Sequence, residues 1–306
     1  MKLPAGVATA LLFSVANAST CDIFDAANTP CVAAHSTVRA LYGNYSGALY
    51  QVQRSSDNTT FDVKASVTGG YADAQGQDTF CANTDCVILR IYDQSSSLNH
   101  LDVAPPGGAH PLKDSPVNAS KLPISVNGHK VYGAYFEGGQ GYRIDISNGV
   151  AKGNDPETIY AVLGGRHYNG GCCFDYGNAE SNNLDTGAGS MEAIYFGNSS
   201  GWGHGGGTGP WIMADLENGL WPANTKAYEG NPTIDYDFVT AMVKGDTNGF
   251  ALKGGDAQAG TLDTLYHGPR PQGYQPMKKQ GSIILGIGGD NSDRAHGSFF
   301  EGVMTT

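Results

Sequence analysis

The chain has 306 residues, of which 44 are glycine and 14 are proline, and only 15% are charged. Its formal net charge of −11 at pH 7 argues against nucleic acid or an anionic membrane as a partner, because no basic stripe is available to neutralise phosphates. A neutral polymer remains compatible with this charge. The length suits one large domain, and all-β domains of roughly 200–250 residues are common.

Residues 1–18 have the pattern of an export signal. Lys2 precedes an apolar run that closes on Ala16-Asn17-Ala18, and this run is well short of the roughly 20 apolar residues that a membrane-spanning helix needs. We therefore expect a secreted protein whose cysteines are oxidised. Four sequons fit this route as candidate glycosylation sites: Asn44, Asn58, Asn118 and Asn198.

Strand-like segments dominate the remainder of the chain. They are rich in β-branched and aromatic residues and are separated by Gly, Asn, Asp or Pro clusters, which is typical of a sandwich or barrel. In chain order they cover residues 48–53, 61–67, 86–92, 130–136, 142–146, 158–163, 191–196, 211–217, 236–243, 282–287 and 299–304. Only residues 30–42 show helical spacing of apolar side chains. Without a visible repeat or linker, we predict a single all-β domain over residues 19–306.

The segment from Trp211 to Glu217 alternates with a period of two. In a strand, Trp211, Met213, Asp215 and Glu217 share one face, and the apolar residues between them share the other. Two carboxylates beside an aromatic ring are an arrangement that sugar-cleaving sites use. The alternative is a solvated face whose acids only keep the sheet soluble.

A second candidate acid, Asp290, follows the paired glycines Gly288 and Gly289 directly after an apolar strand. Paired glycines allow a tight turn and a close approach of the backbone to a ligand. Asp290 is therefore a candidate for a constrained loop at a strand end. The alternative is an ordinary aspartate in a turn.

The six cysteines suggest three disulfides. Cys21 and Cys31 are close enough in sequence to close a small loop, as are Cys81 and Cys86, which leaves the adjacent pair Cys172–Cys173. Such a pair is strained, and strain is tolerated mainly where the surroundings fix it, often at ligand sites, so we expect the pair to present a flat sulfur surface to a sugar. The alternative, that each of the two pairs elsewhere, stays open.

Other chemistries have weaker signals. No histidine pair stands at metal-ligand spacing beside the cysteines, so no metal is expected. Residues 197–201 match the Gly-x-Ser-x-Gly pattern of esterases but run into further glycines, whereas an esterase elbow needs a helix there. Trp202 lies in the loop that follows, where its ring could be a platform for a sugar or a lid on the sandwich.

Taken together, these segments resemble the catalytic domain of the α-L-arabinofuranosidase B family, glycoside hydrolase family 54. The resemblance is carried by residues 21–23, 29–37, 78–83, 172–180, 209–218 and 284–292. In addition, residues 92–95 and 99–101 are similar to a sequence motif that is common in concanavalin-like sandwiches. The resemblance thus implies a concanavalin-like or jelly-roll β-sandwich. The family's C-terminal arabinose-binding β-trefoil has no counterpart in these 306 residues.

The resemblance implies an exo-acting enzyme that releases terminal arabinofuranosyl groups with retention of configuration and without a cofactor. Glu217 matches the family's nucleophile and Asp290 its general acid/base. A retaining pair should stand roughly 5–5.5 Å apart. Positions that line the arabinose pocket match Cys172, Cys173, Trp202, Asp215, Asn218 and Gly289.

The expected partners are arabinose-containing polysaccharides and oligosaccharides of plant cell walls, and the expected state is a monomer. Two alternatives stay open at this point. A carbohydrate-binding sandwich without catalysis would share the fold, since fold does not fix function. An endo-acting glycanase would share the paired carboxylates but would need an open cleft.

Overall fold

The computed structural model describes residues 19–306, so the expected export signal lies outside the described residues. The described part is almost all β, as predicted, with two short helices, α1 (Thr20–Ala26) and α2 (Ala74–Phe80). Its strands are β1 (Cys31–Ser36), β2 (Ala48–Arg54), β3 (Thr60–Lys64), β4 (Cys86–Ile91), β5 (Leu101–Val103), β6 (Leu122–Val126), β7 (His129–Phe136), β8 (Tyr142–Ile144), β9 (Glu157–Gly164), β10 (Asp175–Ala179), β11 (Glu192–Gly197), β12 (His204–Gly205), β13 (Trp211–Asp215), β14 (Leu220–Trp221), β15 (Ala227–Tyr228), β16 (Phe238–Gly245), β17 (Gly249–Asp256), β18 (Asp263–Pro269), β19 (Ser282–Leu285) and β20 (Gly297–Thr305).

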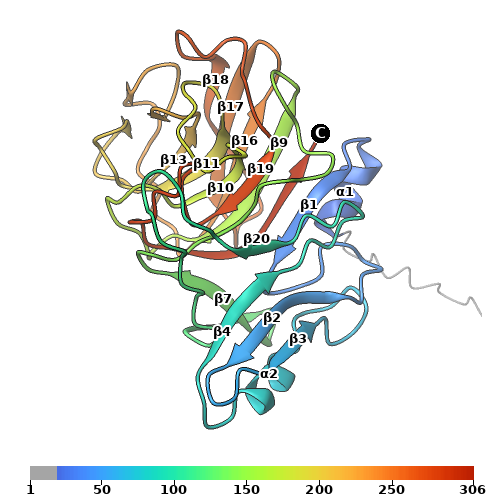
Figure 1. Cartoon of the computed structure of the whole chain (residues 1–306). Coiled ribbons are helices and arrows are strands. Elements are labelled where there is room, and N and C mark those ends of the chain that lie inside the picture. Colours follow the sequence, from blue (N-terminus) through green and yellow to red (C-terminus); the bar gives the residue numbers. More distant parts are fainter. Residues whose placement is uncertain (1–18) are drawn as a thin grey trace, which may run out of the picture.

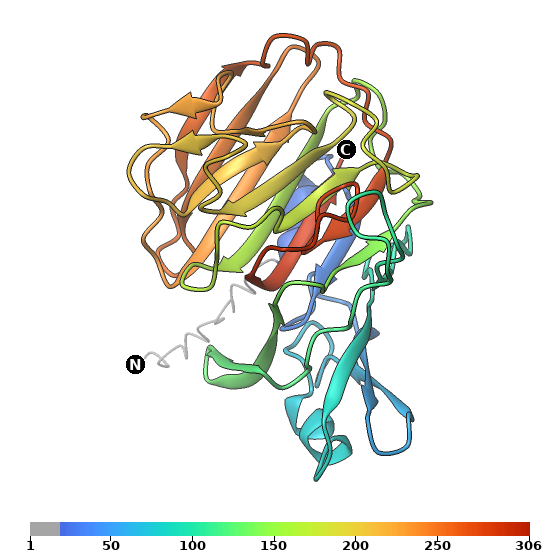
Figure 2. The same ribbon diagram turned by 60° about the vertical axis from the view of Figure 1, so that its left-hand side comes forward.

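Two large sheets form a sandwich. The first has eight strands in the order β18-β17-β16-β9-β20-β7-β6, with β1 also paired to β20, and the second has ten in the order β14-β13-β11-β10-β19-β8-β5-β4-β2-β3. Figures 1 and 2 show the two layers facing each other in the upper part of the molecule, and α2 with β2, β3 and β4 at the lower end. A separate pair, β12 and β15, is parallel.

The core lies between the two sheets. In β9, Ile159, Ala161 and Leu163 are buried while Tyr160 and Val162 are half-exposed, so one face of the strand points inward. Ile159 belongs to the same buried cluster as Ile212 of β13 in the other sheet. Burial of one face of each sheet is the arrangement that period-two alternation predicts for antiparallel strands. All eleven predicted segments overlap strands of the structure.

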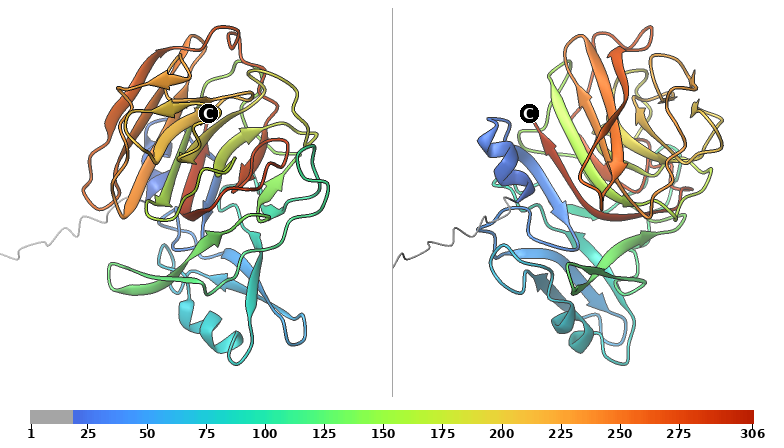
Figure 3. Two further views of the ribbon diagram at one scale, coloured as in Figure 1. Left: turned by 90° about the vertical axis from the view of Figure 1, so that its left-hand side faces the viewer. Right: turned by 180° about the vertical axis from the view of Figure 1, so that it is seen from behind.

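The predicted helix over residues 30–42 is wrong. Cys31–Ser36 is the strand β1, which pairs antiparallel with β20 through Ala34 and Val303 (Figure 3, right). Most of β1 is buried on both faces, with Ala33, Ala34 and His35 all inaccessible to solvent. A strand buried on both faces loses its alternation, and a short apolar run then cannot be distinguished from a helix by periodicity.

The three cysteine pairs are bonded as the spacing suggested: Cys21–Cys31, Cys81–Cys86 and Cys172–Cys173. The first ties α1 to β1, and the second joins the segment after α2 to the start of β4. Within residues 19–306, no helix is both long enough and apolar enough to cross a membrane. Of the four sequons, Asn44 and Asn58 are exposed and Asn118 and Asn198 are partly buried, and glycosylation remains a prediction.

Candidate active site

A hollow of about 240 Å³ lies at one end of β13 and β19. Every residue that the sequence singled out for the pocket lines it: Cys172, Cys173, Trp202, Asp215, Glu217, Asn218, Gly289 and Asp290. Ala109, Asp185, Gly219, Leu220, Gly288 and Ser292 complete the lining. Six separate parts of the chain, from Ala109 to Ser292, therefore meet around one small space.

Successive side chains of β13 and of the residue after it point to opposite faces of the sheet, as the alternation predicts. Ile212, Ala214 and Leu216 belong to the main core between the sheets. Trp211 and Met213 belong to a separate cluster on the opposite face of the sheet. The site is therefore built on the face of the ten-stranded sheet that points away from the core.

Glu217 lies in a turn and not in the strand. The strand ends at Asp215, and Glu217 and Asn218 both have positive φ values, 67° and 55°. Two successive positive φ values are typical of the tight type I′ turn between antiparallel strands, here β13 and β14. The backbone amide of Glu217 donates to Oδ1 of Asp215 at 3.0 Å, and its carbonyl accepts from the Tyr274 hydroxyl at 2.8 Å.

Asp290 lies in the loop that follows β19. Its carbonyl accepts a hydrogen bond from the amide of Ala109, and its Oδ1 accepts one from the amide of Ser292, both at 3.0 Å. A Cβ atom on Gly289 would stand 1.9 Å from Oε2 of Glu180, so this position needs glycine for close packing. The loop is thus fixed by backbone contacts that the paired glycines permit.

Arg143 of β8 holds two segments of the site together. Its Nη1 donates to the carbonyl of Gly289 at 2.9 Å and its Nη2 to the carbonyl of Glu180 at 2.5 Å. The side chain is almost fully buried, and its Nε pairs with Asp145 at 2.7 Å. Burial lowers the pKa of Arg143. Sequence reasoning missed this residue, because neither β8 nor its neighbours resemble a binding motif.

The sulfur pair and Trp202 form two walls of the hollow. Sγ of Cys173 lies 3.5 Å from Oδ2 of Asp215, which places the disulfide directly beside a carboxyl group. Trp202 is 49% exposed, and Nζ of Lys226 lies 5.9 Å from the centre of its ring. An exposed indole beside a cavity is suited to stack on the apolar face of a sugar ring.

Two further acids, Asp175 and Glu180, lie behind the hollow and were missed as site residues. Both are buried, and they belong to residues 172–180, one of the segments that carry the family resemblance. Asp175 is in the fully buried strand β10, where a carboxyl group is unusual unless it is paired. An acid in such a strand is the signal that could have revealed it.

The crowding of these acids raises the pKa values of three of them. Burial, followed by the charges of Asp215 and Glu180, raises the pKa of Glu217 to about 10. Burial raises the pKa of Asp215 to about 7. Burial and the neighbouring Asp215 raise the pKa of Asp175 well above its ordinary value. The buried site therefore favours the protonated forms of Glu217 and Asp175 at neutral pH.

Among residues 19–306, two groups of side chains have potential metal-ligand atoms close to one another. In the first, Cys172 and Cys173 stand near Asp215, but their sulfurs are bonded to each other and offer no thiolate. In the second, Nδ1 of His110 lies 2.7 Å from Oδ2 of Asp293 and 3.5 Å from Oδ1 of Asp114.

Comparison with known proteins identifies the family. The family described as "Alpha-L-arabinofuranosidase B, catalytic" matches residues 20–306. The chain belongs to this family. Alpha-L-arabinofuranosidase B of Aspergillus niger is 55% identical over 302 residues, and that of Aspergillus kawachii is 54% identical over 302 residues. Each alignment covers 96% of this chain and 60% of the relative, so the chain spans about three fifths of these relatives' length.

Solved structures of the family have the same fold. A crystal structure of an arabinofuranosidase complexed with arabinofuranosyl-alpha-1,2-xylobiose is 55% identical and superposes with a TM-score of 0.92, covering 94% of this chain and 61% of that one. A family 54 α-L-arabinofuranosidase soaked with a cyclic sulfate inhibitor gives the same values. The predicted β-sandwich and the predicted family are confirmed.

Proposed function

We propose that this chain is the catalytic domain of a secreted, retaining, exo-acting α-L-arabinofuranosidase that removes terminal arabinofuranosyl groups from plant polysaccharides. The observation that carries the proposal is the joint position of Glu217 and Asp290 in one hollow of about 240 Å³. The relatives' names support this activity, and the arabinofuranosyl-xylobiose bound to a neighbour supports arabinose-bearing xylan fragments as substrates.

In the proposed reaction, Glu217 attacks the anomeric carbon while Asp290 protonates the departing oxygen. Asp290 then accepts a proton from water, which attacks the same carbon and releases arabinose with net retention. Attack requires ionised Glu217, whose pKa is raised by burial and by the charges of Asp215 and Glu180. Asp215 lines the hollow, which supports a role in binding a sugar hydroxyl, and the hydrogen bond that it accepts from the amide of Glu217 orients the turn.

The size of the hollow favours exo action. A volume of about 240 Å³ lies below the roughly 300–1,000 Å³ of most ligand pockets, which suits one small sugar better than a length of chain. Trp202 and the sulfur pair line this small space. An endo-acting enzyme needs a cleft that is open at both ends.

Replacing Glu217 with Gln tests the assignment. We expect hydrolysis of 4-nitrophenyl α-L-arabinofuranoside to fall by at least about 10³-fold, since loss of a nucleophile removes the covalent route. Glu229→Gln, which changes an exposed glutamate, is the control and should retain activity. Near-normal turnover by a folded Glu217→Gln protein would refute the proposal. NMR of the first-formed product anomer tests retention separately.

A further inference from the structure

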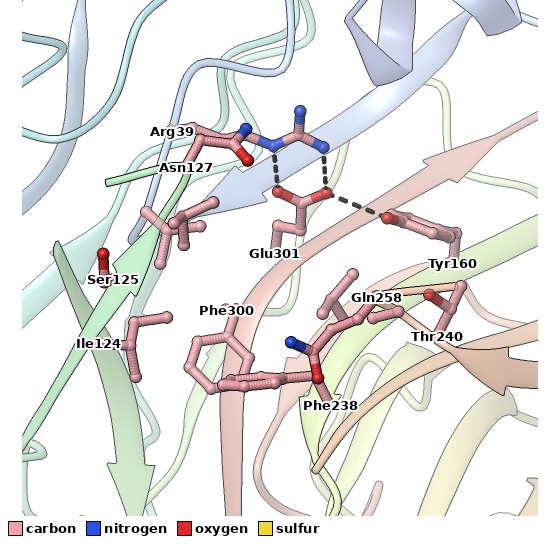
Figure 4. Close-up of a pocket in the computed structure, with 14 residues that line it drawn as sticks. Arg39, Ile124, Ser125, Asn127, Tyr160, Phe238, Thr240, Gln258, Phe300 and Glu301 are labelled. Atoms are coloured by element: carbon pink, nitrogen blue, oxygen red, sulfur yellow. Dashed lines mark hydrogen bonds and ion pairs between the residues drawn. The ribbon is translucent and has the colours of Figure 1, made fainter. Parts of the chain in front are cut away.

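A larger hollow lies on the other outer face of the sandwich. Its volume is about 500 Å³, roughly twice that of the candidate active site, and the two hollows share no lining residue. Its floor is the outer face of β9, β16 and β20, and its walls are β6 and the turn between β17 and β18 (Figure 4). We call it the β6 groove.

The charges of the β6 groove neutralise each other. Arg39 forms a two-pronged ion pair with Glu301, with both contacts at 2.6 Å, and the Tyr160 hydroxyl donates to the same carboxylate at 3.0 Å. The carboxyl side chain is only 4% exposed. Because the glutamate is already bonded to three donor groups, the groove offers no free charge, which disfavours an ionic ligand.

The remaining lining combines apolar rings with free hydrogen-bonding groups. The rings of Phe238 and Phe300 lie 5.3 Å apart and form an apolar corner. Around them stand the hydroxyls of Ser125 and Thr240 and the amide of Gln258, and none of the interactions drawn in Figure 4 engages these groups. Such a mixture matches a sugar, which has an apolar ring face and a rim of hydroxyls.

We infer that the β6 groove is a second carbohydrate-binding site, for a segment of a neutral polysaccharide chain. This inference rests on the proposed function in one respect: it assumes that the polymer bound in the groove also carries the side chains that the candidate active site cleaves. The two hollows are on opposite outer faces, since their floors belong to the two different sheets. A polymer held in the groove therefore leaves the active site free for side chains of the same or a neighbouring molecule.

Electrophoresis in native gels that contain soluble arabinoxylan tests the site. The wild-type chain should be retarded by the polymer. Thr240→Lys places a long charged side chain over the floor of the groove, and Gln258→Ala removes an exposed amide at its wall. We expect each to weaken retardation at least about threefold. Thr60→Lys and Gln75→Ala make the same changes at exposed positions that line neither of the two hollows and should behave as wild type.

Hydrolysis of 4-nitrophenyl α-L-arabinofuranoside should be unchanged in all four variants, because this small substrate needs only the active site. Equal retardation of wild type and all four variants would overturn the inference. A wild type that is not retarded, but sediments as a dimer that Thr240→Lys dissociates, would overturn it in favour of a second copy as the occupant. Groove-dependent retardation without hydrolysis would support the groove and refute the proposed function.

Discussion

At the scale of single residues, the site is defined by crowded, buried acids. The charges of Asp215 and Glu180 add to burial in raising the pKa of Glu217. Two negative charges side by side are strongly disfavoured in such surroundings. Glu180 is buried outside the lining of the hollow, so we expect it to act through Glu217 as a positioning residue.

Glu180→Gln should shift the acid limb of the pH–activity profile. The neighbouring carboxylate raises the pKa of Glu217, so its removal lowers that pKa and lets Glu217 ionise at lower pH. We expect the limb of kcat/KM for 4-nitrophenyl α-L-arabinofuranoside to move down by about one pH unit, which corresponds to about 1.4 kcal/mol. An unmoved limb, with only a lower plateau, would indicate that Glu180 has a purely structural role.

At the scale of elements, the turn between β13 and β14 decides the position of Glu217, the proposed nucleophile. The strand's alternation brings Asp215 to the site face, and the turn then carries Glu217 into the same hollow. A glutamate with positive φ is uncommon, and such conformations persist where the surroundings fix them. The hydrogen bonds from Tyr274 and to Asp215 are the contacts that fix this one.

Two substitutions at Asn218 measure the conformational demand of the turn. Asn218 has a φ of 55°, which glycine adopts freely and alanine does not. Both variants remove the same side chain and its 3.3 Å contact with Asp185. We therefore expect Asn218→Gly to be more stable than Asn218→Ala by about 1 kcal/mol in urea unfolding. Equal or reversed stabilities would show that the turn relaxes out of this conformation.

At the scale of the whole molecule, a buried ion network joins the two sheets behind the site. Lys279, just before β19, contacts Glu157 of β9 at 2.9 Å and Glu192 of β11 at 3.0 Å. Arg270 contacts Glu192 at 2.7 Å. Because β9 and β11 belong to different sheets, the lysine ties one layer of the sandwich to the other and anchors the strand that leads to Asp290.

Lys279→Met should destabilise the protein strongly. It takes from the buried carboxylate of Glu192 one of its two cations, and breaking a buried pair in this way typically costs about 3–5 kcal/mol. The adjacent Lys278 is exposed, so Lys278→Met is a matched control and should change the free energy of unfolding by less than about 0.5 kcal/mol. Similar losses in both variants, measured by urea unfolding, would contradict a role for the network.

The sequence alone determined the strands, the inward face of β13 and the residues of the pocket. Alternation and glycine pairs are local signals, and the family resemblance placed Glu217 and Asp290 in one site. Only the tertiary structure decided that residues 31–36 form a strand, because pairing with β20 overrides a local helical spacing. It also revealed Asp175, Glu180 and Arg143, whose significance depends on burial beside residues distant in the chain. Burial and the crowding of acids are properties of the packed molecule, and no local pattern encodes them.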